Sequence, residues 1–361
     1  RQGLVGRVMV MGCLSERYRN DLQEELPEVD GFFGVWDHRE IVEAAGGKYY
    51  PELCTDRLVT TPSHYAFLKI SEGCDRACAF CAIPGIRGPQ RSRTVDALTE
   101  EASHLAARGT RELILIAQDL THYGTDLTRK KELAPLLRSL LGVEGIDWIR
   151  LHYAYPTGFP EEVIELMASE SRICKYLDIP VQHASDRMLR LMNRGHDRTR
   201  LEQLLQRFRE GVPGLALRTT VMTGYPGETE KDFRELLEFI RTQRFDRLGV
   251  FPYSHEENTP AHRLSDDVPH EEKARRAALI MEEQERISYE LNQEKVGRTL
   301  RVLIDHKEQD FYSGRTEHDS PEVDQEVIVK PPKRRLLQPG AFYSVRITRA
   351  DTFELYGTPV E

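Results

Sequence analysis

Short apolar runs alternate with longer amphipathic stretches through the middle of the chain. The runs have the length of strands, and the stretches between them carry apolar residues at helical spacing. Repeated strand-then-helix units form parallel strands joined by right-handed crossovers. We therefore predict an α/β fold built on a parallel βα barrel or partial barrel. Its six strands are expected at residues 66–70, 112–116, 148–152, 176–179, 216–222 and 247–251.

The pattern changes on both sides of this region. Before about residue 60, an apolar strand ending at Met11 and a helix-like stretch from Ser15 to Leu26 predict a small, partial α/β domain. The stretch 271–295 is rich in Glu, Arg, Ala and Leu and predicts a long exposed helix. From Thr299 the pattern alternates, and Gly, Pro and Asp separate the apolar pairs, which predicts a small C-terminal antiparallel β-barrel. The expected domains are 1–58, 59–290 and 291–361.

Polar residues follow five of the six predicted strands. In βα barrels the working site lies at the C-terminal ends of the strands, so these residues are expected to meet at one mouth. Each of them alone could be an ordinary loop residue or a helix cap, and Thr229 with Asp232 is typical of a capping box. Their agreement predicts a site. The segments are the cysteine-containing loop after 66–70, Gln118 with Asp119, Gln182 with His183, Thr223–Glu228 including Gly224, and Tyr253 with Ser254.

Three closely spaced cysteines, Cys74, Cys78 and Cys81, lie in the loop after the first of these strands. Structural zinc favours four ligands, usually from two separated pairs, and no second pair lies nearby. Thiolates also hold 4Fe-4S clusters, and three of them leave one iron open to a small molecule. The alternative, three buried structural thiols, is not favoured by a charged, glycine-flanked loop. Cys54 and Cys174 are interpreted as ordinary, partly buried thiols.

The charge composition of the chain indicates which class of binding partner to expect. The chain has 361 residues, 50 Lys and Arg against 59 Asp and Glu, and a formal charge of -9, which suits a basic protein partner better than a nucleic-acid backbone. The run Lys330–Arg335 is basic and could bind RNA phosphates or an acidic surface, or could be a solvated loop. We find no membrane-spanning run or signal peptide and expect a cytoplasmic protein. The first residue is Arg1 rather than Met, and we expect a preceding segment.

The C-x3-C-x2-C spacing resembles the signature of radical S-adenosylmethionine enzymes. Over essentially its whole length the chain resembles the radical S-adenosylmethionine methylthiotransferases, with a partial N-terminal methylthiotransferase domain, a radical core and a terminal TRAM-type barrel. Within that family it most resembles the branch that modifies an aspartate of ribosomal protein S-twelve (the RimO branch). The matching segments are 68–74, 86–88 with 91–93, 176–183, 192–195 and 246–251.

The resemblance implies two 4Fe-4S clusters and S-adenosylmethionine, which acts as methyl donor and as radical source. The radical cluster would lie on Cys74, Cys78 and Cys81. The auxiliary cluster would use Cys13 and two cysteines whose positions precede Arg1. The implied reaction adds a methylthio group to the β-carbon of an aspartate in S-twelve, free or within the ribosomal subunit, and needs an electron donor.

Two sets of residues are expected to serve this chemistry. Their position at strand ends makes Gln118, Asp119, Gln182, Gly224 and Tyr253 candidates for binding the cofactor. The arginines that follow the cysteine loop could pair with a carboxylate of substrate or cofactor, because guanidinium binds carboxylate in bidentate fashion. The alternative for these arginines is a role in surface solubility. They are Arg87, Arg91 and Arg93.

Two other functions remain open. A methylthiotransferase acting on an adenosine of transfer RNA would be expected to have a more basic surface. A non-catalytic iron–sulfur module whose terminal barrel binds RNA would not cleave S-adenosylmethionine. An incomplete ligand set beside polar strand ends argues against this second alternative.

Overall fold

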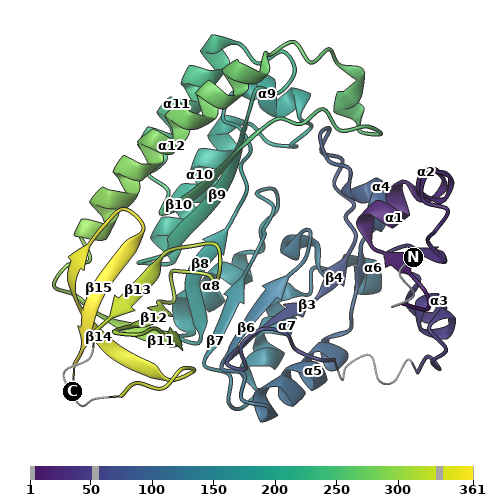
Figure 1. The fold of residues 1–361 in the computed structure, drawn as a ribbon. Coiled ribbons are helices and arrows are strands. Elements are labelled where there is room, and N and C mark those ends of the chain that lie inside the picture. The colour runs from purple at the N-terminus through teal and green to yellow at the C-terminus, as the bar shows by residue number, and fades with distance from the viewer. Residues whose placement is uncertain (1–4, 51–56, 331–335, 361) are drawn as a thin grey trace.

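The protein is described by a computed structural model that covers residues 5–50, 57–330 and 336–360. Its centre is a six-stranded, wholly parallel sheet in which the strands follow chain order from one edge to the other (Figure 1). The sheet is open between its first and last strands, which confirms a partial barrel. The strands are β3 (Tyr65–Lys69), β6 (Glu112–Ile116), β7 (Trp148–Leu151), β8 (Ile173–Asp178), β9 (Ala216–Thr223) and β10 (Arg247–Pro252).

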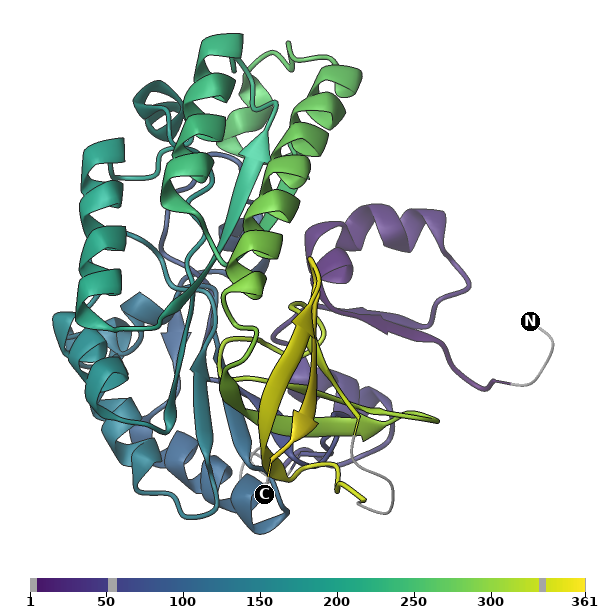
Figure 2. The same cartoon turned by 90° about the vertical axis from the view of Figure 1, so that its left-hand side faces the viewer.

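Helices cover one face of this sheet, and the two ends of the chain lie on the other (Figure 2). Apolar side chains between helices and sheet form one large buried cluster, which is the main source of stability for the core. The capping box predicted at Thr229 and Asp232 opens one of the helices and is confirmed. The helices are α5 (Val95–Ala107), α7 (Leu133–Leu141), α8 (Glu161–Ser169), α10 (Arg198–Gly211) and α11 (Glu230–Gln243), with α6 (Thr125–Thr128) and α9 (Asp186–Leu191) in shorter connections.

The long helix α12 (His270–Gln293) confirms the predicted length but not the predicted exposure. Ile280 and Ile287 are fully buried, and the Gln284 side chain donates to the Phe245 carbonyl over 2.9 Å. The prediction was wrong because much of the buried face is polar. Such a face gives no hydrophobic signal in the sequence.

The N-terminal segment is the small α/β unit that the sequence predicts. Strand β1 (Met9–Met11) pairs in parallel with β2 (Gly31–Phe33), and α3 (His38–Ala44) follows. The predicted helix from Ser15 to Leu26 is instead two short helices that meet at Tyr18, α1 (Cys13–Arg17) and α2 (Arg19–Glu25). Cys13 thereby becomes the first residue of α1.

The C-terminal region is a closed five-stranded barrel. The antiparallel prediction holds for four of its neighbouring pairs, but β13 and β15 pair in parallel. Strand β12 was not predicted, because its only apolar side chain is Tyr312 and no alternation marks it. Residues 331–335 of the predicted basic loop, and Cys54, lie outside the described residues. The strands are β11 (Thr299–Lys307), β12 (Tyr312–Arg315), β13 (Glu326–Val329), β14 (Phe342–Ala350) and β15 (Glu354–Pro359).

Buried charges join this barrel to the parallel sheet. Glu112 on β6 is fully buried and lies 2.7 Å from both Arg150 on β7 and Arg315 on β12. Burial raises the pKa of Glu112, but the two guanidinium groups outweigh burial and hold it below its usual range. The loop between β12 and β13 adds an ion pair from Asp319 to Arg247, at 2.5 Å, and a hydrogen bond between Ser320 and His152. In the part of the chain that the structure covers, no helix is long and apolar enough to cross a membrane.

Candidate functional site

Three free thiols surround a cavity of about 260 Å³ at the C-terminal end of the sheet. They belong to Cys74, Cys78 and Cys81, in the loop between β4 (Ser71–Glu72) and α4 (Ile83–Arg87). Gln118 reaches the same cavity from the end of β6. The structure thus brings the predicted cluster ligands together with one predicted cofactor residue. The rest of the lining is Arg76, Phe80, Ile83, Ala117, Tyr153, Tyr155 and Arg194.

The cysteine-containing loop is held on two sides. On one side the backbone N–H of Cys74 donates to the Gly88 carbonyl over 3.1 Å. On the other, the turn after α9 makes two contacts: Ala79 N–H donates to the Met192 carbonyl at 3.0 Å, and the Asn193 amide donates to the Ala77 carbonyl at 2.7 Å. These bonds fix the loop before any ligand binds.

Burial disfavours the charged thiolate form of Cys74 and Cys81. It raises the pKa of Cys74 to about 11, assisted by the charge of Asp119, and it also raises the pKa of Cys81. A bound metal centre would displace these protons, because coordinated thiols are deprotonated. Two N–H donors are already directed at sulfur: Arg76 N–H lies 3.4 Å from the Cys74 sulfur, and an Arg194 nitrogen lies 3.1 Å from that of Cys78.

The donor set fits an iron–sulfur cluster. The described cavity lining contains neither histidine nor carboxylate. Among the side chains that commonly bind transition metals, it therefore offers cysteine thiolates alone, which are the usual ligands of iron–sulfur clusters. Among the described residues, no group of three His, Cys, Asp or Glu side chains is arranged around a single metal ion. A 4Fe-4S cluster differs in this respect, because each thiolate binds a different iron. Gln118 Oε1 and Arg194 Nε are buried at the cavity without a hydrogen-bond partner. They leave an acceptor and a donor available to a bound group.

Asp119 positions its neighbours. Its carboxylate is buried and accepts hydrogen bonds from Arg76 Nε at 2.7 Å and from the Thr121 backbone at 2.8 Å. Asp119 therefore orients Arg76 at the cavity, and its predicted contact with the cofactor stays a prediction.

The other three predicted cofactor residues do not line the cavity as described. Gln182 and Gly224 follow β8 and β9 and have left-handed φ angles of 68° and 71°. A Cβ on Gly224 would lie 2.1 Å from the Cγ of Lys273, so glycine allows that close approach. Tyr253 packs against Tyr225 with a ring separation of 5.2 Å, in an apolar cluster that includes Ala79. Any contact of these residues with the cofactor stays a prediction.

The three predicted arginines separate in the fold. Arg93 pairs with Glu101 on α5 at 2.5 Å, and Arg91 lies over the Trp36 ring at 4.5 Å. Arg87 donates to the Cys13 sulfur over 3.0 Å and pairs with Glu72 at 2.8 Å. Of the three, Arg87 is the one that contacts a predicted cluster ligand.

A hydrogen-bonded chain connects Cys13 with the thiol cavity. Arg87 joins the Cys13 sulfur to Glu72, and Glu72 accepts from the Gln118 amide over 2.7 Å. Burial raises the pKa of Glu72, but hydrogen bonds and charges from Lys69, Gln118 and Arg87 outweigh it and lower the pKa overall. We call Cys13, Arg87, Glu72 and Gln118 the connecting chain.

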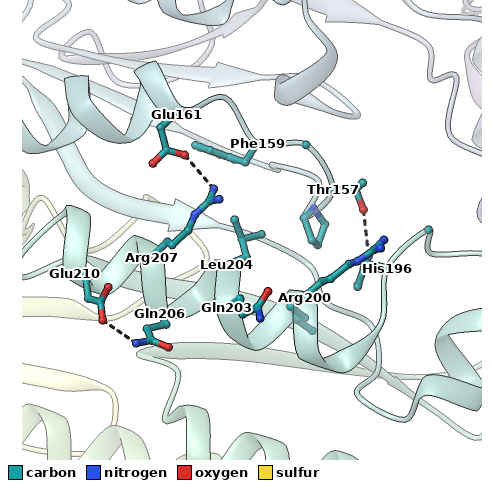
Figure 3. A pocket seen from close by; sticks show the side chains of 14 residues that line it. Thr157, Phe159, Glu161, His196, Arg200, Gln203, Leu204, Gln206, Arg207 and Glu210 are labelled. Atoms are coloured by element: carbon teal, nitrogen blue, oxygen red, sulfur yellow. Dashed lines mark hydrogen bonds and ion pairs between the residues drawn. The ribbon is translucent and has the colours of Figure 1, made fainter.

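A larger cavity of about 640 Å³ lies between the loop after β7 and helix α10 (Figure 3). Glu161 and Arg207 pair across it at 3.0 Å, and Thr157 approaches His196 at 3.3 Å. Its described lining contains no cysteine. The smaller thiol cavity is therefore the candidate site.

Comparison with known proteins agrees with this geometry. A family model described as the radical SAM superfamily matches residues 68–240, and one described as the TRAM domain matches residues 296–360. The ribosomal protein uS12 methylthiotransferase RimO of Flavobacterium johnsoniae is 54% identical over 358 residues, which are 99% of this chain and 82% of the relative. RimO of Christiangramia forsetii is 53% identical, over 100% of this chain and 80% of the relative.

The chain belongs to the RimO family of radical SAM methylthiotransferases. The family resemblance predicted from the sequence is confirmed. A 4Fe-4S cluster and S-adenosylmethionine follow from the radical SAM family match. The cobalamin-dependent S-adenosylmethionine radical enzyme OxsB has a similar fold, with a TM-score of 0.51 and 13% identity over 76% of this chain and 43% of that chain.

Sequence reasoning missed the aromatic and basic part of this RimO-family site. Tyr155 lies between two guanidinium groups, with Arg76 at 4.1 Å and Arg194 at 4.3 Å from its ring centre. Tyr153 lines the cavity and has a left-handed φ of 70°. A signal existed, because both tyrosines follow the third strand of the sheet, the one strand end that the prediction left empty. Arg194 lies in a segment that matched the family, but nothing in the sequence pointed it at a cysteine.

Proposed function

We propose that this chain is a radical SAM methylthiotransferase that adds a methylthio group to the β-carbon of an aspartate in ribosomal protein uS12. The observation that carries the proposal is the set of three thiols around one cavity, linked through the connecting chain to Cys13. Cys13 is joined to the thiol cavity by side chains that hydrogen-bond to one another. This arrangement suits a reaction in which a carbon radical captures sulfur, because holding the reactants close lowers the entropic cost of bringing them together.

In this proposal Cys74, Cys78 and Cys81 hold the 4Fe-4S cluster. With S-adenosylmethionine bound and one electron taken from an external donor, a cluster held there would supply a 5'-deoxyadenosyl radical that can remove hydrogen from carbon. Gln118 offers its buried, unpartnered Oε1 as an acceptor for the methionyl ammonium group or a ribose hydroxyl. Asp119 holds Arg76 in place. Gln182, Gly224 and Tyr253 remain candidates for binding the cofactor.

Cys13 would be a ligand of a second 4Fe-4S cluster, together with two cysteines that are not among residues 1–361. Arg87 would then act at that sulfur. Its guanidinium already donates to the Cys13 sulfur and places a positive charge beside it. Arg91 and Arg93 remain candidates for binding a substrate carboxylate.

A ribosomal substrate supports a cytoplasmic location for the reaction, which also requires an electron donor. The TRAM domain match supports contact with RNA by the C-terminal barrel, and this favours a second candidate substrate. That candidate is an adenosine of transfer RNA.

Mass spectrometry of uS12 tests the proposal. The full-length protein, with all three cysteines of the second cluster, is reconstituted anaerobically and incubated with uS12, S-adenosylmethionine and a reductant. We expect a methylthio gain on one aspartate, and no gain with a Cys78→Ala control. If 5'-deoxyadenosine forms without a gain on uS12, the same assay on transfer RNA decides the substrate. If wild-type protein forms no 5'-deoxyadenosine, the radical mechanism is wrong.

Arg87 has a separate test. We expect Arg87→Ala to lower methylthio transfer at least tenfold while iron content and 5'-deoxyadenosine formation stay at wild-type values, because Arg87 does not line the radical cavity. Arg138→Ala is the matched control, since it removes an arginine that pairs with the exposed Glu162 rather than with sulfur. Wild-type transfer by Arg87→Ala would contradict the assigned role.

A further inference from the structure

Arg194 is a buried cation with an unusual set of partners. Only 3% of its surface is exposed. One terminal nitrogen donates to the Pro180 carbonyl over 2.7 Å, and the other donates to the Cys78 sulfur over 3.1 Å. The guanidinium also lies 4.3 Å from the centre of the Tyr155 ring. Its Nε is buried and has no hydrogen-bond partner among the described residues.

No described carboxylate forms an ion pair with Arg194. The other buried arginines of the described chain do have one: Arg150 and Arg315 pair with Glu112, Arg247 with Asp319, and Arg276 with Glu228. A buried charge without a counter-charge is costly, and proteins retain one only where something compensates it. The groups that Arg194 faces are an aromatic ring and a cysteine sulfur.

The backbone holds Arg194 in this position. Helix α9 ends at Leu191, and the chain then turns through Asn193, which has a left-handed φ of 54°. Arg194 N–H closes the turn by donating to the Leu189 carbonyl over 3.0 Å. The same turn binds the cysteine-containing loop through Met192 and Asn193. Hydrogen bonds therefore hold the two backbone segments from which the Arg194 and Cys78 side chains meet.

We propose that Arg194 is a positioning residue for the radical cluster, whose guanidinium supplies the counter-charge and a hydrogen bond to the Cys78 sulfur and thereby raises the reduction potential. This inference rests on the proposed function, because it assumes a cluster on the three thiols. The reductive step adds one electron from an external donor to the oxidised cluster, and it adds one negative charge to a buried site. A fixed N–H donor and a positive charge at sulfur stabilise that added charge.

The test is a redox titration of the bound cluster, followed by electron paramagnetic resonance. It is made in a Cys13→Ala background, so that a cluster using Cys13 does not contribute to the signal. We expect Arg194→Met to disfavour reduction at least tenfold, which corresponds to a midpoint potential lower by about 59 mV for a one-electron couple. Arg194→Lys keeps the charge but lacks the forked geometry, and we expect a smaller shift in the same direction.

Asn193→Gly is the matched control. It removes the other side-chain bond from this turn to the cysteine-containing loop, at Ala77, and glycine tolerates the left-handed backbone. We expect it to leave the potential unchanged. An equal shift in Asn193→Gly would show that loosening of the loop, rather than the guanidinium, changes the potential, and would overturn the inference.

Iron content separates the possible failures. If the Cys13→Ala parent binds no iron, the proposed radical site itself is wrong. If the parent binds a cluster and Arg194→Met has the parent's potential, only the role of Arg194 is wrong. If Arg194→Met cannot hold iron, the Arg194→Lys titration decides, and an unshifted potential in that variant overturns the inference.

Discussion

Gly73 precedes the first cluster cysteine and has no room for a side chain. Its φ is 82°, and a Cβ would lie 2.2 Å from the Pro89 carbonyl oxygen, an atom of the backbone that cannot simply rotate away. We predict that Gly73→Ala displaces the loop that carries Cys74. Iron bound after reconstitution is expected to fall at least severalfold, as measured by iron analysis and visible absorbance.

Gly88 provides the control for this substitution. It has a similar φ of 70°, but a Cβ there would meet nothing within 4 Å. Gly88→Ala therefore adds backbone strain, about 1–3 kcal/mol at its ψ of -165°, without the steric clash. Equal iron binding by the Gly73→Ala and Gly88→Ala proteins would contradict the prediction.

At this scale the sequence predicted the residues that are chemically distinctive but not their contacts. Cys74, Cys78 and Cys81 were predictable because three thiols at that spacing have few other uses. Arg194 was not, because it reaches Cys78 across 116 residues of sequence, and an arginine after a helix is ordinarily a surface residue. The partners of Arg87, Arg91 and Arg93 were unpredictable for the same reason.

Asp232 in the first turn of α11 takes part in the cap of that helix and also contacts α9. Asp232 accepts from the Thr229 N–H at 2.9 Å within the capping box and from the Ser185 hydroxyl at 2.6 Å, and it pairs with Arg187 on α9. We predict that Asp232→Ala costs about 2–4 kcal/mol of unfolding free energy in urea, because several bonds to a charged group are lost together. It should also loosen the turn after α9.

Asp197 caps α10 through a single bond to the Arg200 N–H at 2.8 Å and is the comparison for Asp232. Asp197→Ala should cost about 1 kcal/mol, the usual value of one cap. The proposed link between α11 and α9 fails if the two substitutions cost the same.

Elements were predicted best where their signal is local. Each of the six parallel strands of the core is an apolar run, and all six lie within a few residues of their predicted positions. The pairing of β13 with β15 was not predictable, because alternation shows that a strand exists but not the direction of its neighbour. The break at Tyr18 and the polar buried face of α12 also depend on packing that the local sequence does not encode.

For the whole molecule, the decisive feature is the buried charge network between the sheet and the C-terminal barrel. Arg315 contacts both Glu112 and Asp305 at 2.7 Å, and only 2% of its surface is exposed. We predict that Arg315→Met destabilises the protein by about 3–5 kcal/mol, since it leaves buried carboxylates with too little positive charge. Urea unfolding followed by circular dichroism measures this loss.

An exposed ion pair serves as the reference. Arg138 and Glu162 lie 3.0 Å apart on the helical face, with more than half of each side chain exposed. Arg138→Met should cost less than about 1 kcal/mol. A comparable loss in both variants would mean that the joint between sheet and barrel contributes no more than a surface contact.

That joint also constrains how a large partner could be presented to the thiols. A barrel fixed by buried ion pairs cannot swing toward its target as a tethered domain would. Any macromolecule that it grips is held at one set separation from the cavity. Only a target side chain at the matching distance from the surface bound by the barrel can reach the sulfur sites. The protein would therefore select its target by distance as well as by chemistry.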